Sequence, residues 1–185
     1  MSDPRDNEGE ARDTPRRVVI TGFMGAGKTT VARALARLLE DSFIDLDDAV
    51  AEAEGRTARE LIDEVGEEYF RETETRALRL ALEEGAARII ATGGGAWTRE
   101  RNRALVAAHN CLSVWLDAPF ELCRQRIEEV GTDERPLARD VEKARRLYEE
   151  RLAAYGLADL RVHVTPHKSA EEIAAEVAAA LVVER

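Results

Sequence analysis

The chain has 185 residues, of which 44% are hydrophobic and 35% charged, and its formal net charge at pH 7 is −10. This composition is typical of a globular domain and excludes a collagen-like or wholly disordered protein. The acidic balance argues against a nucleic-acid partner, because binding to a phosphate backbone needs a basic face.

The first 15 residues have no hydrophobic period and are rich in acidic residues, Arg, Gly and Pro. They predict a disordered acidic tail, followed by one domain over residues 16–185. Five short apolar runs predict β-strands at 17–21, 43–45, 88–92, 112–117 and 161–165. Patterns with helical spacing follow at 28–39, 67–82, 120–127, 141–154 and 170–182. The alternation predicts an α/β fold of three layers, with a five-stranded parallel sheet and helices on both faces.

A complete phosphate-loop motif follows the first predicted strand. In GFMGAGKTT, Gly22, Gly27, Lys28 and Thr29 satisfy the pattern G-x-x-x-x-G-K-[ST]. Glycines let backbone N–H groups converge on one point, and the start of the next helix adds its positive dipole end. We therefore expect ATP here, with Lys28 reaching the outer phosphates and the Thr29 hydroxyl binding Mg²⁺. The predicted nucleotide-binding residues of the loop are Gly22, Gly25, Ala26, Gly27, Lys28, Thr29 and Thr30.

The loop alone leaves the class of phosphate-transfer protein open. The N-K-x-D signature of guanine-specific readers does not occur in the chain, which favours a small-molecule or nucleotide kinase over a GTPase. Two further classes stay open at this point. One is a kinase of another small acceptor, such as gluconate or a nucleotide, and the other is a non-catalytic ATP-binding regulator.

Two acids follow the second predicted strand. Asp45 and Asp47 stand at its carboxyl end, where ligands gather in parallel sheets. Phosphoryl transfer needs one acid near the metal and another that orients or deprotonates the acceptor hydroxyl. The alternative is that Asp45, Asp47 and Asp48 cap the next helix, since acids are favoured in a first turn.

Four segments in this order resemble the motif set of the shikimate kinase family. They are GFMGAGKTT, Asp45-Leu46-Asp47, FRETE at 70–74 and ATGGG at 91–95. The resemblance covers about residues 18–182 and implies a P-loop kinase fold with a helical substrate-binding region at about 45–75 and a lid at about 128–140. It implies ATP-dependent phosphorylation of the shikimate 3-hydroxyl, a step in aromatic amino-acid biosynthesis through chorismate.

The resemblance also assigns roles in acceptor binding. It implies that Asp45 holds Mg²⁺ through water and that Asp47 binds the ring hydroxyls and acts as general base. Arg71 corresponds to the arginine that binds the substrate carboxylate, and a guanidinium fork suits bidentate carboxylate binding. Glu74 corresponds to an acid that helps fix the site. The alternative for Arg71 is an exposed arginine paired at i+3 with Glu74.

The glycines Gly93, Gly94 and Gly95 are expected to line the acceptor pocket, because a backbone that approaches a ligand closely leaves no room for side chains. Further along, Arg135 in R-P-L resembles the lid arginine of the family, which closes over the γ-phosphate and stabilises charge that develops during transfer. The family packs adenine in a region that corresponds here to Arg124 or Arg126 and to the turn at 165–168. Of the two arginines, we expect Arg126 to contact the base.

Two departures from the family pattern concern the acceptor site. The usual R-x-P-L-Y segment occurs as Arg151-Leu-Ala-Ala-Tyr155 without proline, and a partial match stands at Arg145 to Tyr148. We expect Arg151 to be the second carboxylate ligand, because the short connection to the last predicted strand is typical of the family. A frequent pocket phenylalanine is replaced by Ile62.

The remaining chemistry-bearing residues predict no additional site. Cys111 and Cys123 form no C-x-x-C pair and suggest buried, inert thiols in a reducing compartment. His109, His163 and His167 lack metal-ligand spacing. No stretch reaches the roughly 18 consecutive apolar residues of a membrane span, and no apolar signal core is visible. We expect a cytoplasmic monomer whose partners are ATP and shikimate, with no nucleic-acid or membrane partner.

Overall fold

The computed structural model describes residues 16–85, 87–130 and 140–183. Its centre is a five-stranded sheet in the order β2-β3-β1-β4-β5, and the four strand pairings are parallel. The strands are β1 (Val18–Thr21), β2 (Phe43–Asp45), β3 (Ile89–Ala91), β4 (Leu112–Asp117) and β5 (Leu160–His163). All five predicted strands are therefore confirmed, and their ends agree within two residues.

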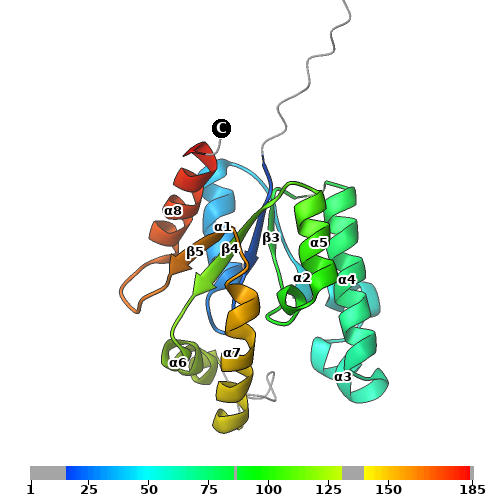
Figure 1. The fold of residues 1–185 in the computed structure, drawn as a ribbon. Helices are drawn as coiled ribbons and strands as arrows, with labels where there is room; N and C mark the ends of the chain where they lie inside the picture. The colour runs from blue at the N-terminus through cyan, green and yellow to red at the C-terminus, as the bar shows by residue number, and fades with distance from the viewer. Residues whose placement is uncertain (1–15, 86, 131–139, 184–185) are drawn as a thin grey trace, which may run out of the picture.

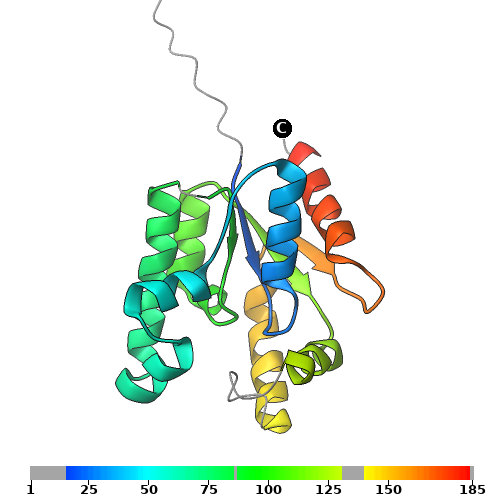
Figure 2. The ribbon, with the colours of Figure 1, turned by 180° about the vertical axis from the view of Figure 1, so that it is seen from behind.

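Helices cover both faces of this sheet. They are α1 (Lys28–Leu39), α2 (Leu46–Glu54), α3 (Ala58–Val65), α4 (Glu67–Glu83), α5 (Glu100–Ala108), α6 (Phe120–Val130), α7 (Val141–Tyr155) and α8 (Ala170–Val183), with a 3₁₀ turn η1 (Ala96–Thr98). Figures 1 and 2 show α1 and α8 on one face and α5 and α7 on the other, with α4 beside α5. The predicted three-layer arrangement is confirmed, whereas α5 was not predicted.

The sheet forms the core because its strands are continuous apolar runs. Val18, Val19 and Ile20 in β1 are completely buried, as expected for a central parallel strand covered on both faces. On α1, the stripe that includes Val31 and Leu35 is buried against the sheet, and the opposite face carries polar residues. This packing fixes the carboxyl ends of the strands at one edge, the lower edge in Figure 1.

The substrate-binding region predicted at about 45–75 is helical and has a small core of its own. Val50 of α2, Leu61 of α3 and Phe70 of α4 form an apolar cluster separate from the main core. A capping box starts α3, because the Thr57 hydroxyl accepts from the Glu60 N–H and the Glu60 carboxylate accepts from the Thr57 N–H. These contacts hold α2 and α3 beside the carboxyl edge of the sheet.

Three further features complete the comparison with the sequence. None of the described helices combines the length and the apolar composition needed to cross a bilayer. The predicted tail, residues 1–15, lies outside the described residues, as do residues 131–139 of the predicted lid. From the lid region, residues 128–130 belong to the end of α6.

Candidate active site

A cavity of about 600 Å³ opens at the carboxyl edge of the sheet, between the phosphate loop and α3. It brings together predicted residues from six separate parts of the chain. Those on its wall are Gly25, Gly27, Lys28, Thr29, Thr30, Asp45, Asp47, Arg71, Gly93, Gly94, Gly95, Arg126 and Arg151. Gly22 and Ala26 are not on this wall, since both are buried below the loop surface. Arg135 lies outside the described residues.

The phosphate loop depends on glycine for its conformation. Gly25 has φ +77°, and a Cβ there would stand 2.5 Å from the carbonyl oxygen of Cys123 in α6. The loop therefore packs directly on α6 through a position that only glycine fits. At its end, α1 begins at Lys28 with no acid in its first turn, so the positive end of the helix dipole faces the loop. Lys28 Nζ donates to the carbonyl oxygen of Phe23, at 3.1 Å, which keeps the ammonium at the loop.

Asp45 connects the phosphate loop with the start of the acceptor side. Its Oδ2 accepts from the Thr29 hydroxyl at 2.5 Å, and its Oδ1 accepts from the Asp47 backbone N–H at 3.0 Å. Asp45 is thus the N-cap of α2, as the capping alternative stated, and it contacts the predicted metal-binding hydroxyl as well. Asp48 lies in the first turn of α2, where capping is sufficient to explain it.

The donor set at this point fits magnesium. Thr29 and Asp45 present a hydroxyl and a carboxylate, and Mg²⁺ prefers oxygen ligands while keeping several waters and substrate phosphates. Among the described residues, no group of three or more His, Cys, Asp or Glu side chains could hold a metal ion by itself. A magnesium ion here would take most of its ligands from phosphate and water, and Thr29 and Asp45 are the side chains that would hold it.

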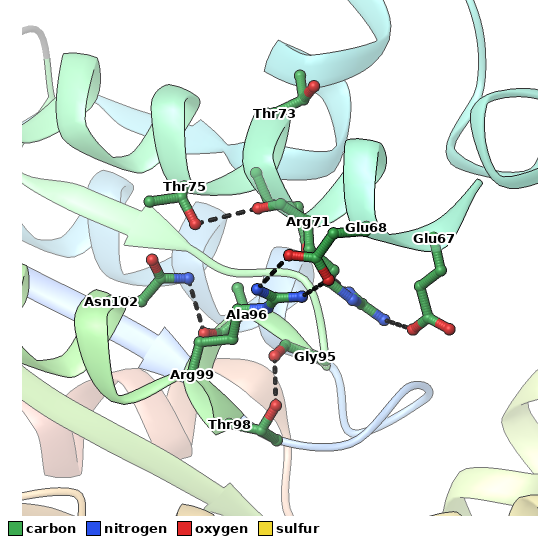
Figure 3. A network of polar contacts seen from close by, with 12 residues as sticks. Glu67, Glu68, Arg71, Thr73, Thr75, Gly95, Ala96, Thr98, Arg99 and Asn102 are labelled. Carbon is green, nitrogen blue, oxygen red and sulfur yellow. Dashed lines mark hydrogen bonds and ion pairs between the residues drawn. The ribbon is translucent and has the colours of Figure 1, made fainter. Parts of the chain in front are cut away.

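Arg71 projects from α4 into the cavity between two acids. Its Nη1 lies 2.6 Å from Glu74 Oε2 and its Nη2 lies 3.0 Å from Glu67 Oε1; Figure 3 shows the second contact. Burial alone lowers the pKa of the guanidinium, but Glu74 and Glu67 outweigh it, so the pKa of Arg71 is raised and the side chain stays cationic. Arg71 is therefore the i+3 partner of Glu74 and also a residue of the cavity wall.

Glu74 is the most deeply buried acid of the site, with 1% of its side chain exposed. Burial raises its pKa, although the neighbouring Arg71 opposes that shift. Its Oε1 has no hydrogen-bond partner among the described residues. A Cβ on Gly93 would collide with this oxygen and would stand 2.6 Å from Asp47 Oδ1. Both carboxylates consequently converge over the Gly93 backbone.

Gly94 and Gly95 each face an arginine. A Cβ on Gly94 would lie 3.4 Å from Arg151 Nη1, and one on Gly95 would lie 2.6 Å from Arg71 Cζ. Gly93 and Gly95 therefore leave room that a Cβ would fill, whereas a Cβ on Gly94 would be in ordinary contact with its neighbours. Two guanidinium groups, from α4 and α7, lie beside the neighbouring residues Gly95 and Gly94. Two cations at such a place attract an anion that has two oxygens, such as a carboxylate.

Arg151 and Arg145 lie in different environments on α7. Arg151 is on the cavity wall. Arg145 pairs with Glu121 of α6 at 2.5 Å, its guanidinium lies 4.4 Å from the centre of the Phe120 ring, and it is not on the wall. Only Arg151 of this pair is placed to meet a ligand beside Gly94.

Arg126 and Arg124 also differ. Arg126 of α6 donates to the carbonyl oxygen of Ala26 at 3.2 Å and reaches the cavity. Arg124 pairs with Glu128 on the exposed side of the same helix, at 3.0 Å. Arg126 is therefore the one that touches the phosphate loop.

The acceptor side contains residues that the sequence analysis did not assign. Wall residues without a predicted role are Met24, Ala58, Arg59, Asp63, Phe70, Thr92 and Glu129. Ile62, noted for its departure from the family, is also on the wall. The pattern T-x-x-E at Thr57–Glu60 is a helix-start signal that could have located α3 and its inward face.

The two cysteines take no part in the cavity wall. Both are buried free thiols. Burial raises the pKa of Cys111, and it raises the pKa of Cys123 to about 11. Protonated thiols are poor nucleophiles and poor metal ligands, which agrees with the predicted inert role.

Comparisons with known proteins identify the family of the chain. A family model described as shikimate kinase matches residues 24–182. A shikimate kinase of Geobacter sulfurreducens is 42% identical over 166 residues, 88% of this chain and 89% of that protein. One of Ruegeria pomeroyi is 38% identical over 177 residues, 94% of this chain and 89% of that protein. A solved shikimate kinase from Acinetobacter baumannii in complex with shikimate has a TM-score of 0.84 at 32% identity, with 93% of this chain and 96% of that chain covered. The chain therefore belongs to the shikimate kinase family.

Proposed function

We propose that this protein transfers the γ-phosphoryl group of ATP to the 3-hydroxyl of shikimate, giving shikimate 3-phosphate and ADP, as a step of aromatic amino-acid biosynthesis through chorismate. The observation that carries the proposal is the position of Arg71 and Arg151 over Gly95 and Gly94, in the same cavity as the phosphate loop. The two guanidinium groups bind the acceptor carboxylate, which orients the ring toward the nucleotide. Membership of the family supports this acceptor.

The nucleotide side is formed by the phosphate loop. Its backbone N–H groups and the start of α1 bind the phosphates, and the Lys28 ammonium moves from the Phe23 carbonyl to the outer phosphate oxygens. The Thr29 hydroxyl and the Asp45 carboxylate would hold magnesium. When bound, Mg²⁺ neutralises phosphate charge and orients the γ-phosphoryl group. Arg126 supports the loop and contacts the base.

On the acceptor side, Asp47 binds the ring hydroxyls and takes the proton of the attacking one. The bond from this hydroxyl oxygen to the γ-phosphorus forms as the bond to the β-γ bridging oxygen breaks, and ADP leaves. The proton on Asp47 passes to solvent. Glu74 holds Arg71 through the 2.6 Å ion pair, so the guanidinium is oriented before the acceptor arrives.

The role proposed for the lid rests on the resemblance to the family. Arg135, which lies outside the described residues, binds the γ-phosphate and stabilises the charge of the transfer step. The lid excludes water and so limits hydrolysis of ATP. We further propose that residues 16–185 act as one kinase domain in a cytoplasmic monomer, and that the net charge of −10 keeps nucleic acids and anionic membranes from binding.

The test is an ADP-release assay with purified protein, MgATP and one acceptor at a time. We expect turnover with shikimate, and at most trace turnover with gluconate or nucleoside monophosphates, because neither matches shikimate in the position of its anionic group relative to the reacting hydroxyl. Turnover of gluconate or a nucleotide without turnover of shikimate would show that this other compound, and not shikimate, is the acceptor. ATP binding without turnover of any of these acceptors would indicate the non-catalytic regulator.

A further inference from the structure

The segment that carries Gly94 and Gly95 is held by side chains. Four successive carbonyl oxygens, from Gly94 to Trp97, each accept a hydrogen bond from a side chain elsewhere in the chain. The donors in order are Tyr155 at 2.6 Å, Thr98 at 2.7 Å, Asn102 at 2.8 Å and Arg103 at 2.8 Å. Figure 3 shows the bonds of Thr98 and Asn102. The position of this segment is therefore set by Thr98 of η1, by α5 and by α7.

Trp97 adds a bond in the opposite direction. Its indole Nε1–H donates to the carbonyl oxygen of Ala154 in the last turn of α7, at 3.0 Å, and only 3% of the residue is exposed. Ala154 is next to Tyr155, which is completely buried and donates to Gly94. Two hydrogen bonds thus connect residues 94–97 to the adjacent residues Ala154 and Tyr155 at the end of α7. Tyr155 is the donor in one, and Trp97 is the donor in the other.

Arg151 stands one helical turn before these contacts. Residues 151 and 154 are i and i+3 on α7 and lie on neighbouring positions of one helix face. A shift or rotation of this last turn changes the place of Arg151 beside Gly94, while Arg71 on α4 stays with Glu74. Bidentate recognition by two guanidinium groups depends on their relative placement, and small displacements of a binding group are costly.

We infer that Trp97 is a positioning residue for the acceptor carboxylate: its indole N–H holds the last turn of α7 in the place where Arg151 and Arg71 can bind one carboxylate together. This inference rests on the proposed function, because it concerns acceptor binding. It assigns to Trp97 an effect on shikimate that acts through Arg151. A tryptophan that only filled the core would affect stability and both substrates alike.

The variant Trp97→Phe removes the indole N–H and keeps an aromatic ring. Loss of one neutral buried hydrogen bond predicts a rise of about 3- to 10-fold in the KM for shikimate. We expect the KM for ATP and kcat to stay within about twofold, since the phosphate loop and Asp47 are untouched. Tyr148→Phe is the matched control. It also removes a bond from α7 to a backbone carbonyl, that of Ala118 at 3.1 Å, and Tyr148 is likewise three positions from Arg151, but this bond does not reach the glycine segment. It should leave the KM for shikimate unchanged.

Double variants separate the route through Arg151 from a general effect. In an Arg151→Ala background, Trp97→Phe should cause no further loss in kcat/KM for shikimate. In an Arg71→Ala background, the same substitution should still lower kcat/KM by its original factor. Equal KM values for shikimate in Trp97→Phe and the unsubstituted protein would overturn the inference, as would full additivity with Arg151→Ala. Failure of the unsubstituted protein to phosphorylate shikimate would overturn the proposed function itself.

Discussion

The guanidinium of Arg71 lies so close to Gly95 that a Cβ at this position would stand 2.6 Å from Arg71 Cζ and 2.7 Å from its Nη2. Gly95 itself has φ −97° and ψ −19°, a conformation that alanine adopts without strain. The glycine is needed for the close approach and not for its backbone angles. The group that must give way is the end of a flexible side chain.

We therefore predict that Gly95→Ala displaces Arg71 without damage to the fold. Loss of a charged hydrogen-bond partner predicts a KM for shikimate raised by about 10- to 150-fold, with the KM for ATP nearly unchanged. Steady-state kinetics and a thermal melt measure both parts. Gly156→Ala is the control, because this glycine also has right-handed helical angles and its nearest neighbours would be 3.5 Å from a Cβ. Normal binding of shikimate by the Gly95→Ala protein would show that Arg71 does not bind this substrate.

Lys28→Ala should abolish turnover and leave the fold intact. The ammonium is bound to the Phe23 carbonyl and is not part of the apolar core, so its loss removes charge stabilisation at the phosphates. We expect a fall in kcat of about 10²-fold or more. Circular dichroism and the ADP-release assay are the measurements, and unchanged turnover would exclude the role of this lysine.

Asp47→Asn keeps the shape of the side chain and removes the base. If the carboxylate takes the proton of the attacking hydroxyl, kcat should fall by about 10²- to 10⁴-fold. The Asp47 backbone bond to Asp45 is retained in this variant, so α2 should begin at the same residue. A rise in the KM for shikimate at constant kcat would show that Asp47 only orients the ring.

Arg151→Ala and Arg145→Ala test the choice between two arginines on one helix. Because Arg151 lies beside Gly94, its loss should raise the KM for shikimate by about 10- to 150-fold. Arg145 makes an exposed pair with Glu121, so its removal should change the KM for shikimate less than about twofold. The opposite ranking would move the second carboxylate contact to Arg145.

The cysteines predict a pH dependence of chemical modification. Burial raises the pKa of Cys111 and brings that of Cys123 to about 11, so both are protonated thiols near pH 8. A thiol reagent should react slowly with the folded protein at pH 8, and the reaction at Cys123 should become faster as the pH rises toward 11. Denatured protein is the control and should react promptly at both residues. Rapid reaction of the folded protein at pH 8 would contradict the buried environment.

The sequence alone predicts those elements whose pattern lies within one short segment of the chain. The five strands are continuous apolar runs, and the loop from Gly22 to Thr29 is a contiguous motif, so both were predicted. Helix α5 was not, because only Asn102 and Val106 of its nine residues are buried and these two positions form no visible stripe. Its role in holding the Ala96 carbonyl depends on one polar side chain, Asn102.

Contacts between distant segments could not be derived from spacing. Trp97 and Ala154 are 57 positions apart, and the bond between them depends on how α7 packs against η1. In the sequence, the short connection to the last strand favours Arg151 over Arg145. The structure adds a physical reason, because Glu121 and Phe120 occupy the environment of Arg145.

The two oxygens of Asp45 have a thermodynamic consequence. One holds the Thr29 hydroxyl of the nucleotide side, and the other caps α2, the helix that presents Asp47 to the acceptor. If MgATP binding moves this carboxylate, the first turn of α2 must adjust with it, and the two binding equilibria then share one coupling free energy. Linkage then requires symmetry: whatever factor MgATP adds to the affinity for shikimate, shikimate adds to the affinity for MgATP.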